Sequence, residues 1–193
     1  AGSDANARIS VLAVDQSGQP VTDYHDTAEF SAFDPLLGAL SDSGNTRFEN
    51  ASVETLFTPS KQAGRAGISV SAPGLAIKTI TLSVLPGAPV SIALTIDSSV
   101  LRADSLDTAT LAARLYDEFG NFANTDSATP ITFRITEDTQ EFGTIVSGAS
   151  GTVKNGEASA VIRGTSLTGP IHIVASSDGL ASGAAELSTI KPF

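Results

Sequence analysis

The stretch Val90–Ile96 reads VSIALTI, so apolar side chains alternate with small or polar ones. A period of two places the apolar side chains on one face of a β-strand. Residues 77–84 and 131–135 repeat the pattern, and their Val, Ile and Thr favour a half-buried sheet surface. No window has the i, i+3, i+4, i+7 apolar spacing of an amphipathic helix. The sequence therefore predicts an all-β fold.

Turn residues separate these short strands. The chain has 17 Gly and 9 Pro, and turn pairs recur at Ser17-Gly18, Asn155-Gly156 and Asp178-Gly179. Many short strands joined by tight turns are typical of antiparallel β-sandwiches.

An internal repeat predicts two domains. Residues 15–18 (DQSG) align with residues 117–120 (DEFG), 102 positions later. Further matches are 105 positions apart, and they pair Asn50 with Asn155, Gly74-Leu75 with Gly179-Leu180, and Leu82 with Leu187. We therefore expect two tandem immunoglobulin-like (Ig-like) sandwiches, at 1–85 and 86–193. Between them Pro86, Gly87 and Pro89 are expected to form a short, semi-rigid linker, because proline cannot extend a central strand.

The register of the repeat predicts that the first domain lacks a strand. In the second domain Val90–Ile96 precedes the segment 108–116, which aligns with residues 6–14. Only residues 1–5 precede residue 6, so the first domain has no counterpart of the strand Val90–Ile96. One sheet edge should then be unpaired. Two explanations stay open: the chain is a piece of a longer array of such domains, or a strand from another subunit fills the gap.

Composition excludes several classes of function. The 193 residues include 11 Lys+Arg and 21 Asp+Glu, which gives a formal net charge of -10. This surface repels nucleic acid and anionic lipid. With no Cys and only 2 His, thiol catalysis, disulfides and Cys/His zinc sites are excluded. No stretch of ~18 apolar residues occurs, so the sequence predicts no membrane-spanning segment. The Ser/Thr-rich, Lys-poor composition fits an extracellular or cell-surface bacterial protein.

No catalytic residue and no cofactor site is predicted. The sequence has no Gly-x-Ser-x-Gly elbow, no P-loop and no Gly-x-Gly-x-x-Gly motif. His25 and His172 have no cysteine or second histidine nearby in sequence. Asp117, Gly120 and Asn121 are interpreted as a turn, because these residue types adopt positive φ and bond their own backbone.

Two acidic segments raise the question of calcium, which takes six to eight oxygen ligands. They contain Asp97, Asp104 and Asp107, and Glu137, Asp138 and Glu141. Neither has the Asp-x-Asp-x-Asp-Gly pattern of a calcium loop, so solvated loop charge is the favoured interpretation. The segment 97–107 is the better calcium candidate because it lies near the linker in sequence.

Four motifs of the second copy resemble a known family. They are residues 117–121 (DEFGN), 131–133 (ITF), 155–158 (NGEA) and 177–180 (SDGL). In this order they resemble the bacterial Ig-like (Big) domains of intimin/invasin-type surface proteins, over nearly all of 88–190. The resemblance implies an Ig-like sandwich without an active site, used as a spacer or presentation module, with neighbouring Ig-like domains of the same chain as partners.

The leading functional hypothesis is a non-enzymatic structural module of a cell-surface or secreted protein, which presents a binding tip or forms part of a fibre or layer. The alternatives are a ligand- or carbohydrate-binding adhesin module, a strand-donating fibre subunit, and an accessory domain of an extracellular hydrolase. The apolar alternation also predicts a buried core in the second domain, made of Val90, Ile92, Leu94, Leu111, Phe133, Ile135, Val161, Ile173 and Leu187.

Overall fold

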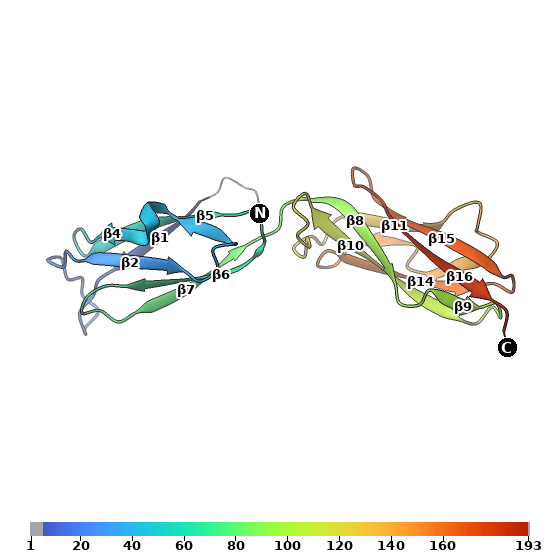
Figure 1. The fold of residues 1–193 in the computed structure, drawn as a ribbon, viewed down its shortest axis with the longest axis horizontal. Coiled ribbons are helices and arrows are strands. Elements are labelled where there is room, and N and C mark those ends of the chain that lie inside the picture. Colours follow the sequence, from blue (N-terminus) through green and yellow to red (C-terminus); the bar gives the residue numbers. More distant parts are fainter. Residues whose placement is uncertain (1–5, 193) are drawn as a thin grey trace. The chain divides into compact units, whose positions relative to one another are not determined.

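The computed structural model describes residues 6–192 and forms two compact units, Ala1–Leu85 (unit 1) and Pro86–Phe193 (unit 2). Both are Ig-like β-sandwiches, and strands make up the ordered elements apart from one short 3-10 turn, η1 (Ser41–Gly44) (Figure 1). The predicted all-β class is confirmed. Among the described residues, no helix has the length and apolarity needed to cross a bilayer.

Unit 2 consists of a four-stranded and a five-stranded sheet. The four-stranded sheet has the order β12-β14-β10-β8 and contains β8 (Pro89–Ile96), β10 (Thr108–Asp117), β12 (Gly143–Ser147) and β14 (Glu157–Gly164). The five-stranded sheet has the order β13-β11-β15-β16-β9 and contains β9 (Val100–Arg102), β11 (Pro130–Ile135), β13 (Ser150–Thr152), β15 (Gly169–Ser176) and β16 (Gly183–Ile190). All pairs are antiparallel except β16 with β9.

Unit 1 repeats this plan with fewer strands. One sheet has the order β1-β5-β3 and contains β1 (Ala7–Leu12), β3 (Gly38–Leu40) and β5 (Ser52–Pro59). The other has the order β4-β2-β6-β7 and contains β2 (Thr27–Ala32), β4 (Asn45–Arg47), β6 (Gly64–Ser71) and β7 (Lys78–Val84).

The main difference between the two units is one segment. In unit 2, β8 pairs with β10 and β9 pairs with β16, so residues 89–102 cover one edge of each sheet. Within residues 6–85, no strand takes either place, and β1 and β7 are edge strands. Among the described residues of unit 1, two sheet edges therefore have no partner strand, where the sequence pattern predicted one.

Most of the predicted core is correct. Ile92, Leu111, Phe133, Ile173 and Leu187 are buried. Residues 94, 135 and 161 are only partly buried.

The prediction for Val90 is wrong, because its side chain is 44% exposed. On β10, Tyr116 pairs with Ser91 but Asp117 pairs with Pro89, so Val90 is the extra residue of a β-bulge. A bulge interrupts the alternation of faces, and sequence periodicity does not reveal it.

Candidate functional site

The Asp117 carboxylate accepts four hydrogen bonds close to the linker residue Gly87. It is 3% exposed and lies at the end of β10. Its Oδ1 accepts hydrogen bonds from the backbone N–H of Phe119 at 2.9 Å and of Asn121 at 2.8 Å. Its Oδ2 accepts from the Asn121 side-chain amide and from the Gly87 backbone N–H, both at 2.8 Å. The aspartate thus closes its own turn and also holds the linker residue Gly87.

These donors determine the charge of Asp117. Burial alone would raise the pKa of this carboxyl, but the hydrogen bonds from Asn121, Gly87 and Phe119 lower its pKa below the usual value. The carboxylate is therefore ionised at neutral pH and stabilised by its donors. The turn predicted at Asp117, Gly120 and Asn121 is present, with Gly120 at φ 79°.

The linker differs from the prediction at Pro89, which is the first residue of β8 and lies opposite Asp117 in the sheet. Gly87 precedes the strand, and its N–H donates to the Asp117 side chain. Proline is tolerated at the first position of a strand because a missing N–H costs least there. The contact between Gly87 and Asp117 joins residues 30 apart, and no sequence motif marks it.

The repeat equivalent in unit 1 is Asp15. Its Oδ1 accepts hydrogen bonds from the Ser17 backbone N–H at 2.8 Å, the Ser17 hydroxyl at 2.6 Å and the Gln19 N–H at 3.0 Å. The pKa of Asp15 is lowered mainly by the Ser17 hydroxyl. The turn is the same in both units, and in unit 2 Asp117 also accepts a hydrogen bond from the linker residue Gly87.

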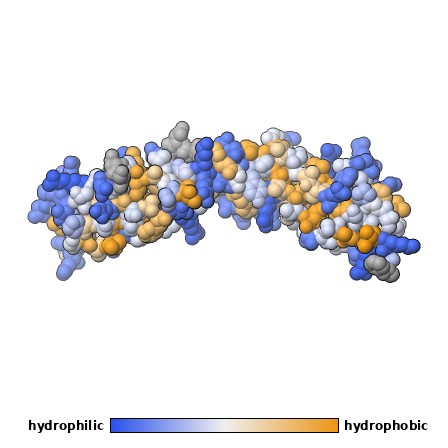
Figure 2. Space-filling view, in the orientation of Figure 1, coloured by the Kyte–Doolittle hydropathy of each residue, from blue (hydrophilic) through white to orange (hydrophobic). Residues whose placement is uncertain are grey.

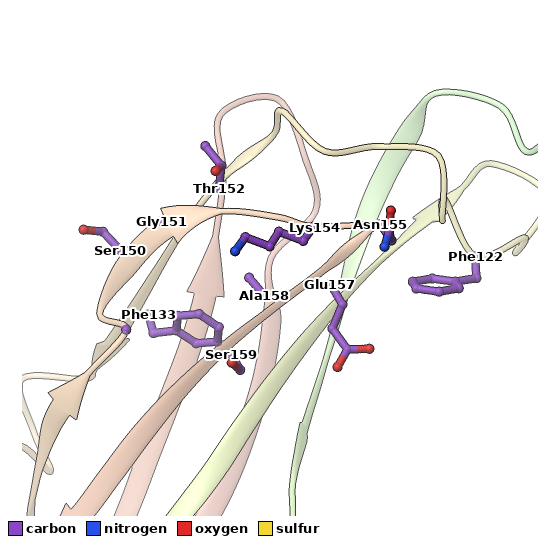
Figure 3. Close-up of a pocket in the computed structure, with 11 residues that line it drawn as sticks. Phe122, Phe133, Ser150, Gly151, Thr152, Lys154, Asn155, Glu157, Ala158 and Ser159 are labelled. Carbon is purple, nitrogen blue, oxygen red and sulfur yellow. The ribbon is translucent and has the colours of Figure 1, made fainter.

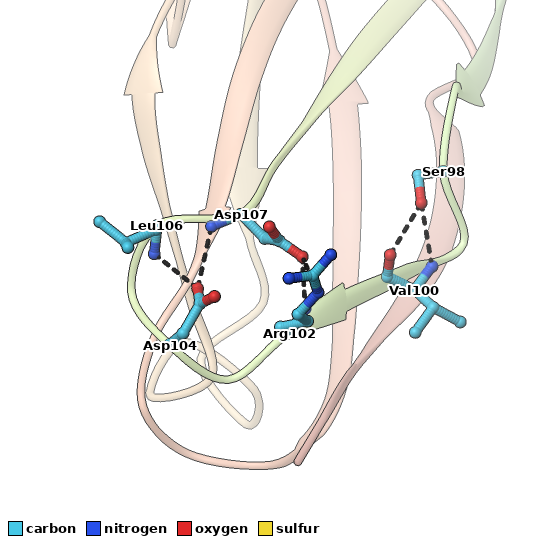
Figure 4. Close-up of polar contacts among 6 residues, drawn as sticks. All are labelled: Ser98, Val100, Arg102, Asp104, Leu106 and Asp107. Carbon is cyan, nitrogen blue, oxygen red and sulfur yellow. Dashed lines mark hydrogen bonds and ion pairs between the residues drawn. The ribbon is translucent and has the colours of Figure 1, made fainter. Parts of the chain in front are cut away.

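Two of the three calcium candidates, Asp104 and Asp107, bind their own loop (Figure 4), whereas Asp97 binds β10. The Oδ1 of Asp104 accepts from the N–H groups of Leu106 and Asp107, at 2.8 and 3.1 Å. The Oδ2 of Asp107 accepts from the Arg102 N–H at 3.0 Å and lies 3.5 Å from Arg102 Nε. The Oδ1 of Asp97 accepts from the Thr110 N–H at 2.8 Å.

Calcium binding would need several of these carboxylates to face one point, and each of them instead accepts a hydrogen bond from a backbone N–H group. Within residues 6–192, no group of three or more His, Asp or Glu side chains is close enough to hold a metal ion. Backbone donors from Thr110 and Leu106 lower the pKa values of Asp97 and Asp104 respectively. Asp104 and Asp107 thus stabilise the loop that connects β9 to β10, and Asp97 joins the end of β8 to β10.

The second acidic segment lies beside His172. Asp138 Oδ2 is 3.5 Å from His172 Nδ1, and Glu186 Oε2 is 3.8 Å from His172 Nε2. All three side chains are well exposed, so solvent screens the pairs and they contribute little to stability. Glu137 and Glu141, also exposed, do not join them as a metal cluster.

A pocket of about 600 Å³ lies between β13 and β14 in unit 2 (Figure 3). Its polar side chains diverge: Figure 3 shows Lys154 and Glu157 extending in different directions, and Glu157 Oε2 binds Arg114 Nε at 2.8 Å. Phe133 in its wall is 3% exposed and belongs to the core. The second aromatic residue, Phe122, packs against Tyr116 at 6.0 Å between ring centroids. Both aromatic side chains in the pocket wall thus pack against other residues of unit 2.

The fold and these polar groups define a class: tandem Ig-like domains whose carboxylates organise turns, loops and the linker. The adhesin FdeC of Escherichia coli is similar to the chain, with a TM-score of 0.64 and 18% identity over 98% of this chain and 60% of that one. InvD of Yersinia pseudotuberculosis has a TM-score of 0.64 and 23% identity over 96% of this chain and 53% of that one. At the level of the fold, the resemblance to intimin/invasin-type surface domains is confirmed.

The comparisons also include glycoside hydrolases. A family model described as glycoside hydrolase family 2 C-terminal domain 5 matches residues 92–186, all within unit 2. A glycosyl hydrolase family 2 member from Bacteroides cellulosilyticus has a TM-score of 0.51 and 18% identity, over 98% of this chain and 29% of that one. The chain thus spans less than two thirds of each of these solved structures. No curated protein matches the sequence significantly.

Proposed function

We propose that the chain is a non-catalytic structural module of an extracellular or cell-surface protein, in which Ig-like domains space or present a neighbouring functional part. Several features support this. The fold is shared with FdeC and InvD. The buried or loop carboxylates at Asp97, Asp104 and Asp117 are bonded to backbone donors, an arrangement suited to rigidity and not to proton transfer.

The hydrogen bond between Gly87 and Asp117 carries the proposal. Its donor lies in the linker and its acceptor is buried at the end of β10, so the last linker residues are held to the body of unit 2. A charge-assisted hydrogen bond to a buried carboxylate is among the stronger polar contacts. A spacer needs such a contact, because a linker that swings freely transmits neither position nor force.

Small-angle X-ray scattering of the full chain tests this role. Asp117→Ala should broaden the distribution of interatomic distances, because Gly87 loses its acceptor. The control is Asp15→Ala, which removes the same turn acceptor in unit 1 and should leave the distribution unchanged. Identical scattering from the wild type and Asp117→Ala would contradict the spacer mechanism. Turnover of p-nitrophenyl glycosides by the wild type would contradict a non-catalytic role.

A second candidate is an accessory, non-catalytic domain of an extracellular glycoside hydrolase. The match of residues 92–186 to a glycoside hydrolase C-terminal domain supports it. The complete reading frame discriminates the two candidates. A catalytic domain in the same frame supports the accessory role, whereas further Ig-like repeats beside a surface-anchoring region support the surface module. A glycan array adds a check on sugar binding, with Lys154→Ala as the variant of the pocket in Figure 3.

A further inference from the structure

A tight turn before β14 in unit 2 places an asparagine directly before a glycine, at Asn155-Gly156 (Figure 3). Lys154 and Glu157 close the turn, because the N–H of each donates to the carbonyl of the other, at 2.8 and 3.1 Å. Asn155 has φ 51° and Gly156 has φ 77°. Positive φ at both central residues identifies a type I′ turn, for which Asn-Gly is a preferred pair. The same dipeptide is chemically labile.

Deamidation of an asparagine needs only water and hydroxide. The Gly156 nitrogen gives up its proton to hydroxide and attacks Cγ of Asn155, so an N–C bond forms and ammonia leaves with the side-chain nitrogen. Water then opens the resulting succinimide ring at one of its carbonyl carbons. Opening at Cγ gives aspartate, whereas opening at the main-chain carbonyl gives isoaspartate, in which the main chain runs through the side chain.

The turn meets the chemical requirements of this reaction. A glycine after the asparagine favours the attack, because no Cβ crowds the attacking nitrogen. Asn155 is exposed, and Figure 2 shows hydrophilic surface, in blue, on the part of unit 2 next to the linker. Water therefore reaches the side chain that reacts.

The folded unit nevertheless holds the attacking nitrogen. The Gly156 N–H donates to the Asp126 carbonyl at 2.6 Å, which withholds it from base as in protection from hydrogen exchange. The Gly156 carbonyl accepts from the Leu115 N–H at 3.0 Å. Gly156 is buried, and a Cβ there would come within 2.5 Å of the Ala123 carbonyl oxygen. Its nitrogen is therefore free to react only after the chain around Asp126 has moved away.

The segment that guards the turn is organised by Asp126. Its Oδ1 accepts from the N–H groups of Ala128 and Thr129, at 2.9 and 3.0 Å, and its Oδ2 accepts from the Thr129 hydroxyl at 2.7 Å. These bonds fix the path of the chain at Asp126 and so the position of its carbonyl. The Ser127 hydroxyl adds a contact, because it accepts from the Asn155 N–H at 3.1 Å.

We propose that Asn155 is a modification site whose deamidation records the opening of the segment 123–129. In the folded unit, the hydrogen bond from Gly156 to Asp126 keeps the site unreactive, and opening of the segment exposes it. Isoaspartate adds a main-chain carbon to a two-residue turn whose glycine is packed against Ala123, so the modified turn does not restore the bond to Asp126. A molecule that has opened therefore stays marked, which is a property separate from the spacer role.

Peptide mapping by mass spectrometry measures the rate of deamidation at Asn155 in the full chain, in mildly alkaline buffer. The reference is the free peptide of residues 152–158. We expect the folded wild type to react at least tenfold more slowly than the peptide, and at the rate of the peptide in urea that unfolds unit 2. Asn50 is the internal comparison, because its turn also has positive φ at both residues but Ala51 follows it, and it should stay unmodified over the same time.

Two variants test the guard. Asp126→Ala should speed the reaction of the folded chain at least fivefold. Ser127→Ala, which keeps Asp126 in place, should speed it at least twofold, so the test does not depend on one variant. The matched control is Asp104→Ala, because Asp104 Oδ1 accepts from the N–H groups two and three residues later, as Asp126 does, in the loop between β9 and β10. It should leave the rate unchanged, and thermal unfolding verifies that each variant is folded.

Four results would overturn the proposal. The first is reaction of the folded wild type at the rate of the free peptide, and the second is no reaction at Asn155 in urea. The third is an equal rate for Asp126→Ala, Ser127→Ala and Asp104→Ala. The fourth is an isoaspartyl product whose Leu115 and Gly156 N–H groups are as protected from hydrogen exchange as in the wild type, which would mean that the turn re-forms and keeps no record.

Discussion

Gly183 lies directly against the main chain of Ile92, and a Cβ at this glycine would come within 2.8 Å of the Ile92 carbonyl oxygen. This contact lets β8 pass close to the start of β16 while it pairs with β10. The front strand of unit 2 therefore depends on the absence of one side chain.

Gly183→Ala is accordingly expected to destabilise unit 2 by about 1–3 kcal/mol, the usual cost of overpacking. Hydrogen exchange in denaturant should show faster opening at Ile92 and Leu94. The matched control is Gly151→Ala, because a Cβ at Gly151 meets nothing within 4 Å. If both variants open at the same rate, the close approach has no energetic role.

Phe133→Ala should destabilise unit 2 by roughly 3–5 kcal/mol, because it removes a buried ring and leaves a cavity. Phe133 is 3% exposed in β11 and belongs to the main cluster of unit 2. Chemical denaturation of the full chain measures the loss, and Leu106→Ala, at a side chain 77% exposed, is the control. An unchanged midpoint for Phe133→Ala would mean that the strand register is incorrect.

Alternation of residue types predicted the strands that are long and half-buried. Residues 90–96 and 131–135 lie in β8 and β11, and Ile92 and Phe133 are buried as expected. Three-residue strands such as β9 and β13 are too short to show a period, so pairing with a neighbour alone defines them.

The polar contacts could be predicted only in part. The turn at Asp117 follows from residue types that favour positive φ. The hydrogen bond from Gly87 to Asp117 joins residues 30 apart in the sequence, and no sequence pattern indicates that they meet. The backbone donors that bind Asp97, Asp104 and Asp107 could likewise not be predicted from residue types alone.

Thr189→Val should destabilise unit 2 by about 1–3 kcal/mol, because it leaves buried backbone groups without a partner. The Thr189 hydroxyl donates to the Leu167 carbonyl at 2.7 Å and accepts from the Gly169 N–H at 2.9 Å, and the residue is 3% exposed. Differential scanning calorimetry checks the loss against Thr144→Val, an exposed position on β12. Unit 1 carries Val84 at the equivalent position, so the hydroxyl serves unit 2 specifically. Equal unfolding temperatures for the two variants would contradict this role.

Asp117→Asn should make unit 2 less stable at neutral pH, and the difference from the wild type should vanish in acid. Hydrogen bonds hold the pKa of the Asp117 carboxyl below its usual value in the folded state, against the opposing effect of burial. A carboxyl with a lowered folded pKa adds stability above its unfolded pKa of about 3.9, and this stability is lost as the pH falls through the folded value.

The neutral amide keeps the shape of the side chain but loses the charge, and its NH₂ group opposes the donors of Gly87 and Asn121. We expect a loss of about 1–3 kcal/mol at pH 7, by the energies of hydrogen bonds to charged groups. Urea unfolding of both proteins between pH 7 and pH 2.5 measures the difference, and effects common to other carboxyls cancel in it. Asp178→Asn, at an exposed turn, serves as the control and should give a small difference at every pH. A difference between the wild type and Asp117→Asn that stays constant down to pH 2.5 would show that the ionised carboxylate contributes nothing to the hold on Gly87.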